Sequence, residues 1–234
     1  MKHLILALQF MTRLPLPAIE ADKQDYAKAM RWFPAAGLVV GGCVAGAVWV
    51  LGRFDPWLGA LGGLAAWVGM TGALHLDGLG DIADAAGAAH KDKARLKAVL
   101  SDPHIGSFGV VAIVMQLLAK LVLLHDPGDA LWLVAIIAAA ARVGPLAWTL
   151  VLPPLHEGLG TLFRDGVGRR HVVFWGAGLA LVLPFAPWLV VAVPAIALWA
   201  LWIRRRIGGI SGDGHGAGIE LVETALLLAM VCAR

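Results

Sequence analysis

The chain has 234 residues, of which 59% are hydrophobic and only 15% are charged, and its formal net charge is +3. Its mean hydropathy is +0.78. Soluble domains have about 45–50% apolar and about 25% charged residues, so this composition excludes a soluble enzyme, a soluble binding module and a disordered chain. It predicts an all-α, polytopic membrane helical bundle, folded as one integral-membrane domain over residues 1–234.

The first apolar segment, HLILALQFM at residues 3–11, follows directly after Lys2. It is too short to cross a bilayer, which takes about 20 residues. It also lacks a small-residue cleavage site, so a cleaved signal peptide is the less favoured alternative. We expect a short interfacial or re-entrant helix here.

Longer apolar segments follow, and each is a candidate for a membrane span. We expect spans at 32–51, 57–76, 105–124, 130–152 and 219–233. The apolar stretch 172–203 is too long for one ordinary span, and Pro184 and Pro187 lie near its middle. Because proline interrupts a helix, we divide this stretch into two short helices. The sequence therefore predicts about seven transmembrane helices.

Lysine and arginine residues gather on one side of this predicted bundle. Nearly all of them fall in the long connections 12–31, 77–104, 153–171 and 204–218. The opposite side has only Arg53 and Arg234. Because basic residues collect on the cytoplasmic side, we expect the long connections to face the cytoplasm from a bacterial inner membrane. The pI of about 9.1 is explained by these basic connections beside the lipid bilayer. We therefore expect no nucleic-acid partner.

The segment HLDGLGDIADA, residues 75–85, is the first candidate site. Asp77, Asp81 and Asp84 are spaced i, i+4 and i+7, which places them on one face of a helix. Three such carboxylates repel each other unless a cation lies among them. Mg²⁺ binds a few carboxylates and keeps positions for phosphate oxygens. The alternative to a metal site is a solvated helix end that carries three charges. For His75, the sequence leaves open a metal ligand, a base or a polar cap.

The glycine-rich segment GGISGDGHGAGIELVE, residues 208–223, is the second candidate. We expect a loop in which Gly209 and Gly212 let the backbone approach a ligand closely, with a flexible hinge as the alternative. The acidic residues of the segment are Asp213, Glu220 and Glu223. The two glutamates lie at the entrance of the last span, where carboxylates are costly unless they are paired or metal-bound.

Three further polar residues are candidates for substrate binding. Asp102 lies in KAVLSDPHIGSFG, residues 97–109, beside two glycines. Lys120 and Arg142 fall inside predicted spans, where ionisable residues usually face a partner or a polar cavity. Lys120 could instead extend its side chain to the interface. For Arg142 we favour a functional role or a buried pair, because a guanidinium group suits phosphate and carboxylate equally.

Taken in order, several segments resemble the adenosylcobinamide-GDP ribazoletransferase family, the membrane-bound cobalamin (5′-phosphate) synthases. They are RLPLP near the start, RWFPAAGLVVGG (31–42), TGALHLDGLGDIADA (71–85), LSDPHIGSFGVVAIVMQLLAK (100–120), EGLG (157–160) and GGISGDGHGAGIELVE (208–223). Pro103 and His104 stand where that family usually has Ser-Arg, and Gly214-His215 stands where other residues are common. The roles of His104 and His215 therefore stay open.

The resemblance implies a transferase that joins adenosylcobinamide-GDP to α-ribazole or α-ribazole 5′-phosphate and releases GMP, with Mg²⁺ as its cofactor. The residues that we expect to be catalytic are His75, Asp77, Asp81 and Asp84. Those expected to bind the metal are Asp77, Asp81, Asp84, Asp213, Glu220 and Glu223. Those expected to bind substrate are Asp102, Lys120, Arg142, Gly209 and Gly212. A homo-oligomer and other enzymes of the cobalamin pathway stay open as partners.

Other membrane proteins with acidic clusters are the alternatives. CDP-alcohol phosphotransferases share a DG-x-x-A-type motif, but here the arginine after that alanine is missing and the later aspartates are spaced differently. Prenyltransferases with two aspartate-rich loops are a weaker match. A cation transporter or channel would place carboxylates at the bilayer midplane, whereas these cluster at the ends of the predicted spans.

Overall fold

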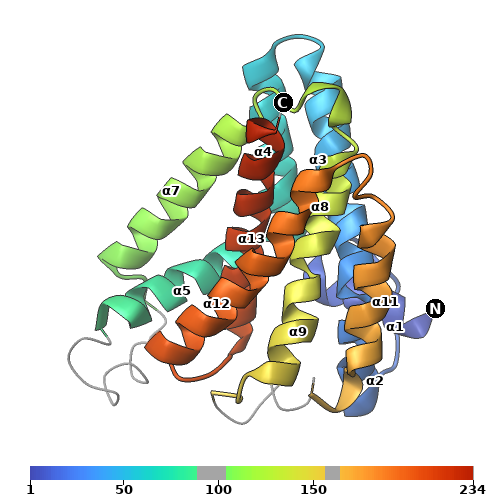
Figure 1. The fold of residues 1–234 in the computed structure, drawn as a ribbon, viewed down its shortest axis with the longest axis vertical. Helices are drawn as coiled ribbons and strands as arrows, with labels where there is room; N and C mark the ends of the chain where they lie inside the picture. The colour runs from blue at the N-terminus through green and yellow to red at the C-terminus, as the bar shows by residue number, and fades with distance from the viewer. Residues whose placement is uncertain (89–103, 156–163, 234) are drawn as a thin grey trace.

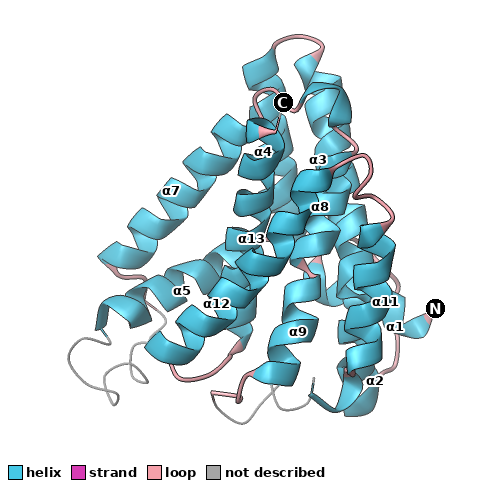
Figure 2. Ribbon diagram, in the orientation of Figure 1, coloured by secondary structure: helices cyan, strands magenta, loops and turns pink. Residues whose placement is uncertain are grey.

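A computed structural model describes residues 1–88, 104–155 and 164–233, and in these ranges the chain forms helices and connecting loops (Figures 1 and 2). One isolated β-bridge joins Pro154 to Ile210. In chain order the helices are α1 (Lys2–Met11), α2 (Lys23–Ala29), η1 (Met30–Trp32), α3 (Phe33–Gly52), α4 (Pro56–Thr71), α5 (Leu74–Ala88), α7 (Ser107–Leu123), η2 (Gly128–Ala130), α8 (Leu133–Ala141), α9 (Val143–Val151), α11 (Arg169–Ala180), η3 (Pro187–Val191), α12 (Ala192–Arg206) and α13 (Gly212–Cys232). The expected all-α class is confirmed.

Four helical stretches in the described residues are long and apolar enough to cross a membrane. They are Lys23–Gly52, Leu133–Val151, Pro187–Arg206 and Gly212–Cys232. The bent pair α4–α5 makes a fifth if it counts as one span, and α7 is shorter. The bundle therefore provides four or five candidate spans by this measure, compared with the seven that the sequence predicted. The N-terminal helix forms as α1, and its interfacial or re-entrant placement stays a prediction.

The predicted span 57–76 is divided by a sharp corner. Helix α4 ends at Thr71 with Gly72 as its cap, and α5 continues at an angle of 85° to it. The Gly72 and Ala73 amides donate to the Gly69 and Val68 carbonyls, the Schellman pattern of a helix end. Gly72 and Ala73 both have φ near +59°. Two consecutive left-handed residues turn the chain, so α5 lies across the bundle end instead of continuing through it (Figure 1).

The segment expected as a glycine-rich loop is a helix from Gly212 onward, which corrects the sequence-based prediction. Ser211 caps α13, because its hydroxyl accepts from the Gly214 amide at 3.1 Å. The glycines serve close helix packing: a Cβ on Gly216 would lie 3.1 Å from the His75 Cα of α5. Small residues let membrane helices approach in this way. Helix α13 therefore begins seven residues earlier than the expected span 219–233.

Small residues also join the first long helix to the middle of the bundle. A Cβ on Gly37 would lie 2.5 Å from the Ala138 carbonyl of α8, and one on Gly41 would lie 2.6 Å from the Ala135 Cα. This G-x-x-x-G spacing places both glycines on the face of α3 that packs against α8.

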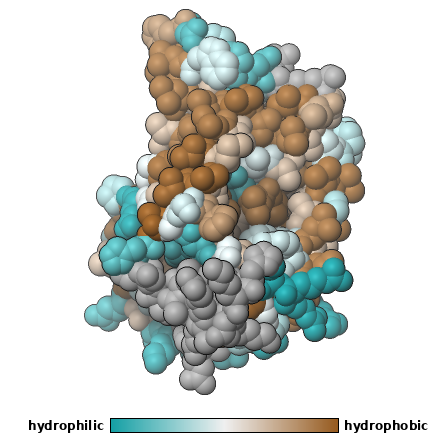
Figure 3. All heavy atoms as spheres, turned by 90° about the vertical axis from the view of Figure 1, so that its left-hand side faces the viewer, coloured by the Kyte–Doolittle hydropathy of each residue, from teal (hydrophilic) through white to brown (hydrophobic). Residues whose placement is uncertain are grey.

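The outer surface is that expected of a membrane protein. A broad apolar region covers one part of the molecule, and polar residues gather at one end (Figure 3).

Candidate active site

The carboxylates of α5 occupy one side of an amphipathic helix. Asp77, Asp81 and Asp84 fall on one face, as their spacing predicted, and the helix runs without interruption from Leu74 to Ala88. Leu79 on the opposite face is buried. Asp77 is exposed, whereas Asp81 and Asp84 are half-buried. The acidic face is therefore partly open, and we call Asp77, Asp81, Asp84 and the neighbouring Asp213 the carboxylate face.

The start of α13 brings Asp213 to this face. A Cβ on Gly78 would lie 2.8 Å from both the Cα and the carbonyl oxygen of Asp213, so the two backbones touch at this glycine. In the part of the chain that the structure describes, the charges that act on the Asp81 carboxylate are those of Asp213, Asp77 and Asp84, and all of them are negative. Of the expected metal ligands on the second motif, Asp213 therefore lies beside those of the first motif.

Asp84 has a structural partner on the next helix. Its carboxylate accepts hydrogen bonds from the backbone amides of Gly106 at 2.7 Å and Gly109 at 3.0 Å. These amides belong to the N-terminus of α7, where no local side chain provides a cap. A carboxylate there satisfies unpaired amides and complements the helix dipole. A Cβ on either glycine would collide with Asp84, which explains the two glycines of the I-G-S-F-G segment.

The remaining carboxylates of α5 have no basic partner in the described ranges, where no ion pair joins Asp77 or Asp81 to a lysine, arginine or histidine. In the same ranges, no three His, Cys, Asp or Glu side chains are close enough to form a metal site by themselves. The face is thus an acidic surface with one or two carboxylates available at any one point.

His75 lies in the interior, away from the carboxylate face. It is 2% exposed, and its Nε2 is 3.4 Å from the Met11 sulfur of α1. Its Nδ1 is buried without a hydrogen-bond partner. His75 and Asp77 are two positions apart on the helix, so their side chains point about 200° away from each other. This placement does not support the roles of base or metal ligand that were considered for His75.

Four ionisable side chains form a buried network where α7, α8 and α13 meet. The Lys120 ammonium lies 2.7 Å from Glu220 and 2.6 Å from Glu223, and Arg142 Nη1 lies 2.7 Å from the other Glu223 oxygen. All four side chains are at most 2% exposed. The two cations and two carboxylates balance, as burial in a bilayer requires. We call these four residues the ion-pair network.

Neighbouring polar and aromatic groups contact the network, although Nε and Nη2 of Arg142 have no hydrogen-bond partner among the described residues. The Gln116 amide donates to the backbone carbonyl and the side chain of Glu220, at 2.9 and 2.8 Å. The Lys120 ammonium lies 4.1 Å from the centre of the Trp67 ring of α4, a cation–π contact. Arg142 also donates to the Ala138 carbonyl at 2.8 Å. The structure thus confirms the buried-pair alternative for Arg142.

This arrangement differs from the roles that we expected for these residues. Lys120 and Arg142 were expected to bind substrate, and Glu220 and Glu223 to bind metal. Their charges are instead compensated by one another inside the bundle. A metal ion at Glu223 would have to displace both Lys120 and Arg142, so the structure does not support these substrate and metal roles.

The other candidate residues have separate positions. Gly209 packs against the end of α9, where a Cβ would lie 2.7 Å from the Pro153 carbonyl, while a Cβ on Gly212 would meet no atom within 4 Å. His215 is 8% exposed, and its Nε2 lies 3.4 Å from the Thr149 hydroxyl. His104 is exposed. Asp102 and the EGLG segment lie outside the described residues.

Sequence reasoning missed several residues that organise this region. Gly78 and Gly106 were not assigned to specific contacts, and Gln116 and Trp67 were not identified as partners of the buried charges. A signal existed for Gln116, because an amide in an apolar helix one turn before Lys120 falls on the same face. The close approach of Gly78 to α13 required the fold.

The comparisons with known proteins agree over nearly the whole chain. The family model described as cobalamin-5-phosphate synthase matches residues 3–231. A protein from Novosphingobium aromaticivorans named adenosylcobinamide-GDP ribazoletransferase is 57% identical over 98% of this chain and 96% of its own length. Proteins with the same name from Thiobacillus denitrificans and Deinococcus radiodurans are 49% and 39% identical, over 97% of this chain and 94% and 84% of their own lengths.

No solved structure matches the chain. The family match covers α1, the carboxylate face, the ion-pair network and nearly all of α13. The resemblance first seen in separate motifs therefore extends through the elements that hold both charged clusters. The chain belongs to the cobalamin-5-phosphate synthase family, whose members are transferases of cobalamin synthesis.

Proposed function

We propose that this protein transfers the cobinamide phosphate of adenosylcobinamide-GDP to the ribose hydroxyl of α-ribazole or α-ribazole 5′-phosphate and releases GMP. Membership of the family and the name carried by its relatives support this reaction. The observation that carries the assignment of the site is the acidic face of α5, which meets Asp213 at the backbone contact of Gly78. Diphosphate chemistry needs such a cation-binding surface.

The carboxylate face fits Mg²⁺ as a shared site. Mg²⁺ is usually held by one or two carboxylates, several waters and substrate phosphate oxygens. Among the described residues, the charges that act on Asp81 are those of Asp213, Asp77 and Asp84, all negative, and no described cation pairs with Asp77. We therefore propose that one or two of Asp77, Asp81 and Asp213 bind the ion at a time, with water and substrate oxygens completing its shell, while Asp84 is engaged with the amides of α7. Bound Mg²⁺ would neutralise charge on the diphosphate and help to align it for attack.

The bond changes follow from the two substrates. The acceptor hydroxyl oxygen forms a bond to the cobinamide-linked phosphorus, while the bond from this phosphorus to the bridging oxygen breaks. The bridging oxygen leaves with its electron pair as part of GMP, and the hydroxyl proton passes to a nearby carboxylate. We assign this acceptance to Asp77 or Asp81, because His75 is buried against Met11. A partly exposed carboxylate can accept such a proton within hydrogen-bond reach.

The proposed membrane placement follows from charge. The connection between α12 and α13, with Arg204, Arg205 and Arg206 before it, lies at the end of the bundle opposite the α3–α4 turn and the C-terminus (Figure 1). Basic residues favour the cytoplasmic side. We place this end, with the carboxylate face, on the cytoplasmic side of a bacterial inner membrane.

The test is GMP release by protein reconstituted in vesicles, measured over a range of Mg²⁺ concentrations. Asp77→Asn and Asp81→Asn should each lower the rate about 100-fold or more, since loss of a few kcal/mol of transition-state stabilisation has that effect. Asp213→Asn should raise the Mg²⁺ concentration needed for half-maximal rate. Asp165→Asn is the control, because Asp165 is exposed on a separate helical turn. Near-normal rates in both α5 variants would exclude the metal assignment.

A further inference from the structure

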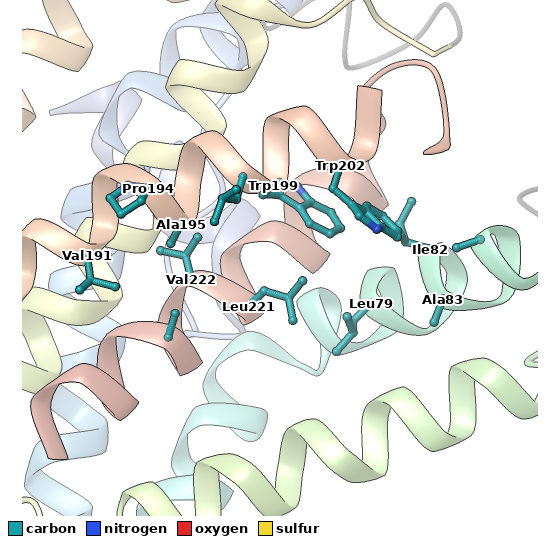
Figure 4. A pocket seen from close by; sticks show the side chains of 13 residues that line it. Leu79, Ile82, Ala83, Val191, Pro194, Ala195, Trp199, Trp202, Leu221 and Val222 are labelled. Atoms are coloured by element: carbon teal, nitrogen blue, oxygen red, sulfur yellow. The ribbon is translucent and has the colours of Figure 1, made fainter. Parts of the chain in front are cut away.

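An open apolar groove runs between α5, α12 and α13. Its volume is about 590 Å³. Leu79 and Ile82 line it from α5, Leu221 from α13, and Trp199 and Trp202 from α12 (Figure 4). The lining residues carry no charged side chain. The groove lies behind the carboxylate face, because the residues of α5 that line it occupy the opposite side of the helix.

The groove has the length of one lipid chain. It follows η3 and α12 from Val191 to Trp202, a separation of eleven positions that rises about 16 Å along a helix. One leaflet contributes about half of the roughly 30 Å hydrocarbon thickness. Trp202 is 41% exposed and stacks on Trp199 with ring centres 5.1 Å apart. Tryptophan at such a position is typical of the membrane interface.

The α12 residues that line the groove lead directly to arginine. Starting from Val191 of η3, they recur every three or four residues as Pro194, Ala195, Leu198, Trp199 and Trp202. The same spacing reaches Arg205 and Arg206 next. Arg206 donates to the Ala86 carbonyl of α5 at 3.0 Å, which joins α12 to α5 at the mouth of the groove. Arg205 is exposed and forms no ion pair with any described residue.

A second groove on the other side of α12 provides an internal comparison. It has a volume of about 640 Å³ and is also apolar, and α12 contributes Val193, Ala197 and Ala200 to it. These positions lead by the same spacing to Arg204. The two grooves therefore allow matched substitutions on one helix.

We propose that the groove between α5 and α12 binds one acidic phospholipid, with an acyl chain along α12 and the headgroup phosphate on Arg205. An apolar groove at membrane depth suits hydrocarbon, and the basic mouth complements a phosphate anion. The lipid would fill the space between α5 and α12 and so support the helix that carries the carboxylate face. The proposal concerns binding and does not depend on the reaction assigned to that face.

Native mass spectrometry of the purified full chain tests this site, with phosphatidylglycerol and phosphatidylcholine of identical acyl chains as probes. The wild type should bind phosphatidylglycerol about fivefold or more tightly, because one basic residue near the membrane contributes about that factor for an acidic lipid. Arg205→Gln should remove most of this preference, whereas Arg204→Gln should keep it. Ala195→Phe should fill the groove and weaken both lipids, whereas Ala197→Phe on the second groove should not.

Melting curves of each variant identify any that fail to fold, and Arg205→Lys then replaces Arg205→Gln as a milder change that should retain part of the preference. Equal binding of the two lipids by the wild type would overturn the proposal. So would equal losses in Arg204→Gln and Arg205→Gln, or tight lipid binding in folded Ala195→Phe. Displacement of the lipid by an equal concentration of glycerol 3-phosphate would identify a free-phosphate site and also overturn it.

Discussion

Replacing Glu223 by glutamine removes the carboxylate that both buried cations share. Its two oxygens lie 2.6 Å from Lys120 Nζ and 2.7 Å from Arg142 Nη1. At an effective dielectric constant of about 20, each contact provides about 6 kcal/mol of gross attraction, which largely offsets desolvation. Breaking a buried pair from one side costs about 3–5 kcal/mol. We expect Glu223→Gln to lower the free energy of unfolding by this amount.

The assay is unfolding of the purified protein by SDS in mixed micelles, followed by circular dichroism. Arg142→Gln should also destabilise the protein, because Glu223 loses one of its two cations. In the double variant Lys120 and Glu220 still balance each other, at 2.7 Å. The double variant should therefore be more stable than the sum of the single effects predicts, by about 1–3 kcal/mol. Glu20→Gln, at an exposed position, should change stability by less than about 0.5 kcal/mol.

Two results would refute this reasoning. Strict additivity of Glu223→Gln and Arg142→Gln would mean that the two side chains do not interact in the folded protein. Wild-type stability of Glu223→Gln, together with a higher Mg²⁺ requirement for GMP release, would identify Glu223 as a metal ligand. The network would then have to rearrange when the metal binds.

Three further substitutions test the contacts around α5. Gly78→Ala should destabilise the protein by about 1–3 kcal/mol, because its Cβ would press on the Asp213 backbone; Gly69→Ala, with open space around it, is the control in the same SDS titration. Asp84→Asn should cost about 1 kcal/mol by weakening the cap on α7, measured as a lower melting temperature, with an unchanged Mg²⁺ requirement. Ala73→Gly should leave stability unchanged or raise it by about 1 kcal/mol in SDS unfolding, because Ala73 is left-handed.

Much of the helical arrangement could be predicted from the sequence, because span length and apolar content are local properties. The expected span 32–51 differs from α3 by one residue at each end. The division of 172–203 at its prolines is also confirmed, since α11 ends at Ala180 and η3 starts at Pro187. The corner after α4 was not predictable in this way, because the apolar pattern continues unchanged through Gly72 and Ala73.

The largest error of the sequence-based prediction is the loop expected in the glycine-rich segment, which is a helix from Gly212 onward. In a single sequence, a glycine-rich stretch fits either a loop or a helix that packs closely against its neighbours. In residues 212–218 the second explanation holds, because Gly216 faces the backbone of His75 and Gly214 faces Ile203 and Ile210. The choice between the two depends on neighbours far away in the chain, which a local pattern does not contain.

The parts of the candidate site that depend on helical periodicity could be predicted from the sequence. The parts that depend on pairing between distant residues could not. The spacing of Asp77, Asp81 and Asp84 was sufficient to place them on one face. The partners of Glu223 are 103 and 81 residues away, at Lys120 and Arg142. No local pattern links positions at such separations, so the sequence alone does not distinguish a carboxylate that is paired with distant cations from one that binds a metal.

Helix α13 carries Asp213 at its start and Glu220 and Glu223 deeper in the bundle, and these two positions differ in how they would receive a cation. Asp213 and Glu220 are seven residues apart, or about 10 Å along the helix. At the deeper position each carboxylate already has a lysine or arginine within 2.7 Å. At the other position Asp213 joins Asp77 and Asp81, and the charges that described neighbours exert on Asp81 are all negative. An additional cation would be favoured at the carboxylate face and would find no uncompensated charge at the ion-pair network. The network can thus hold α13 in place, while the start of the same helix carries Asp213 toward the metal-bound substrate that we propose.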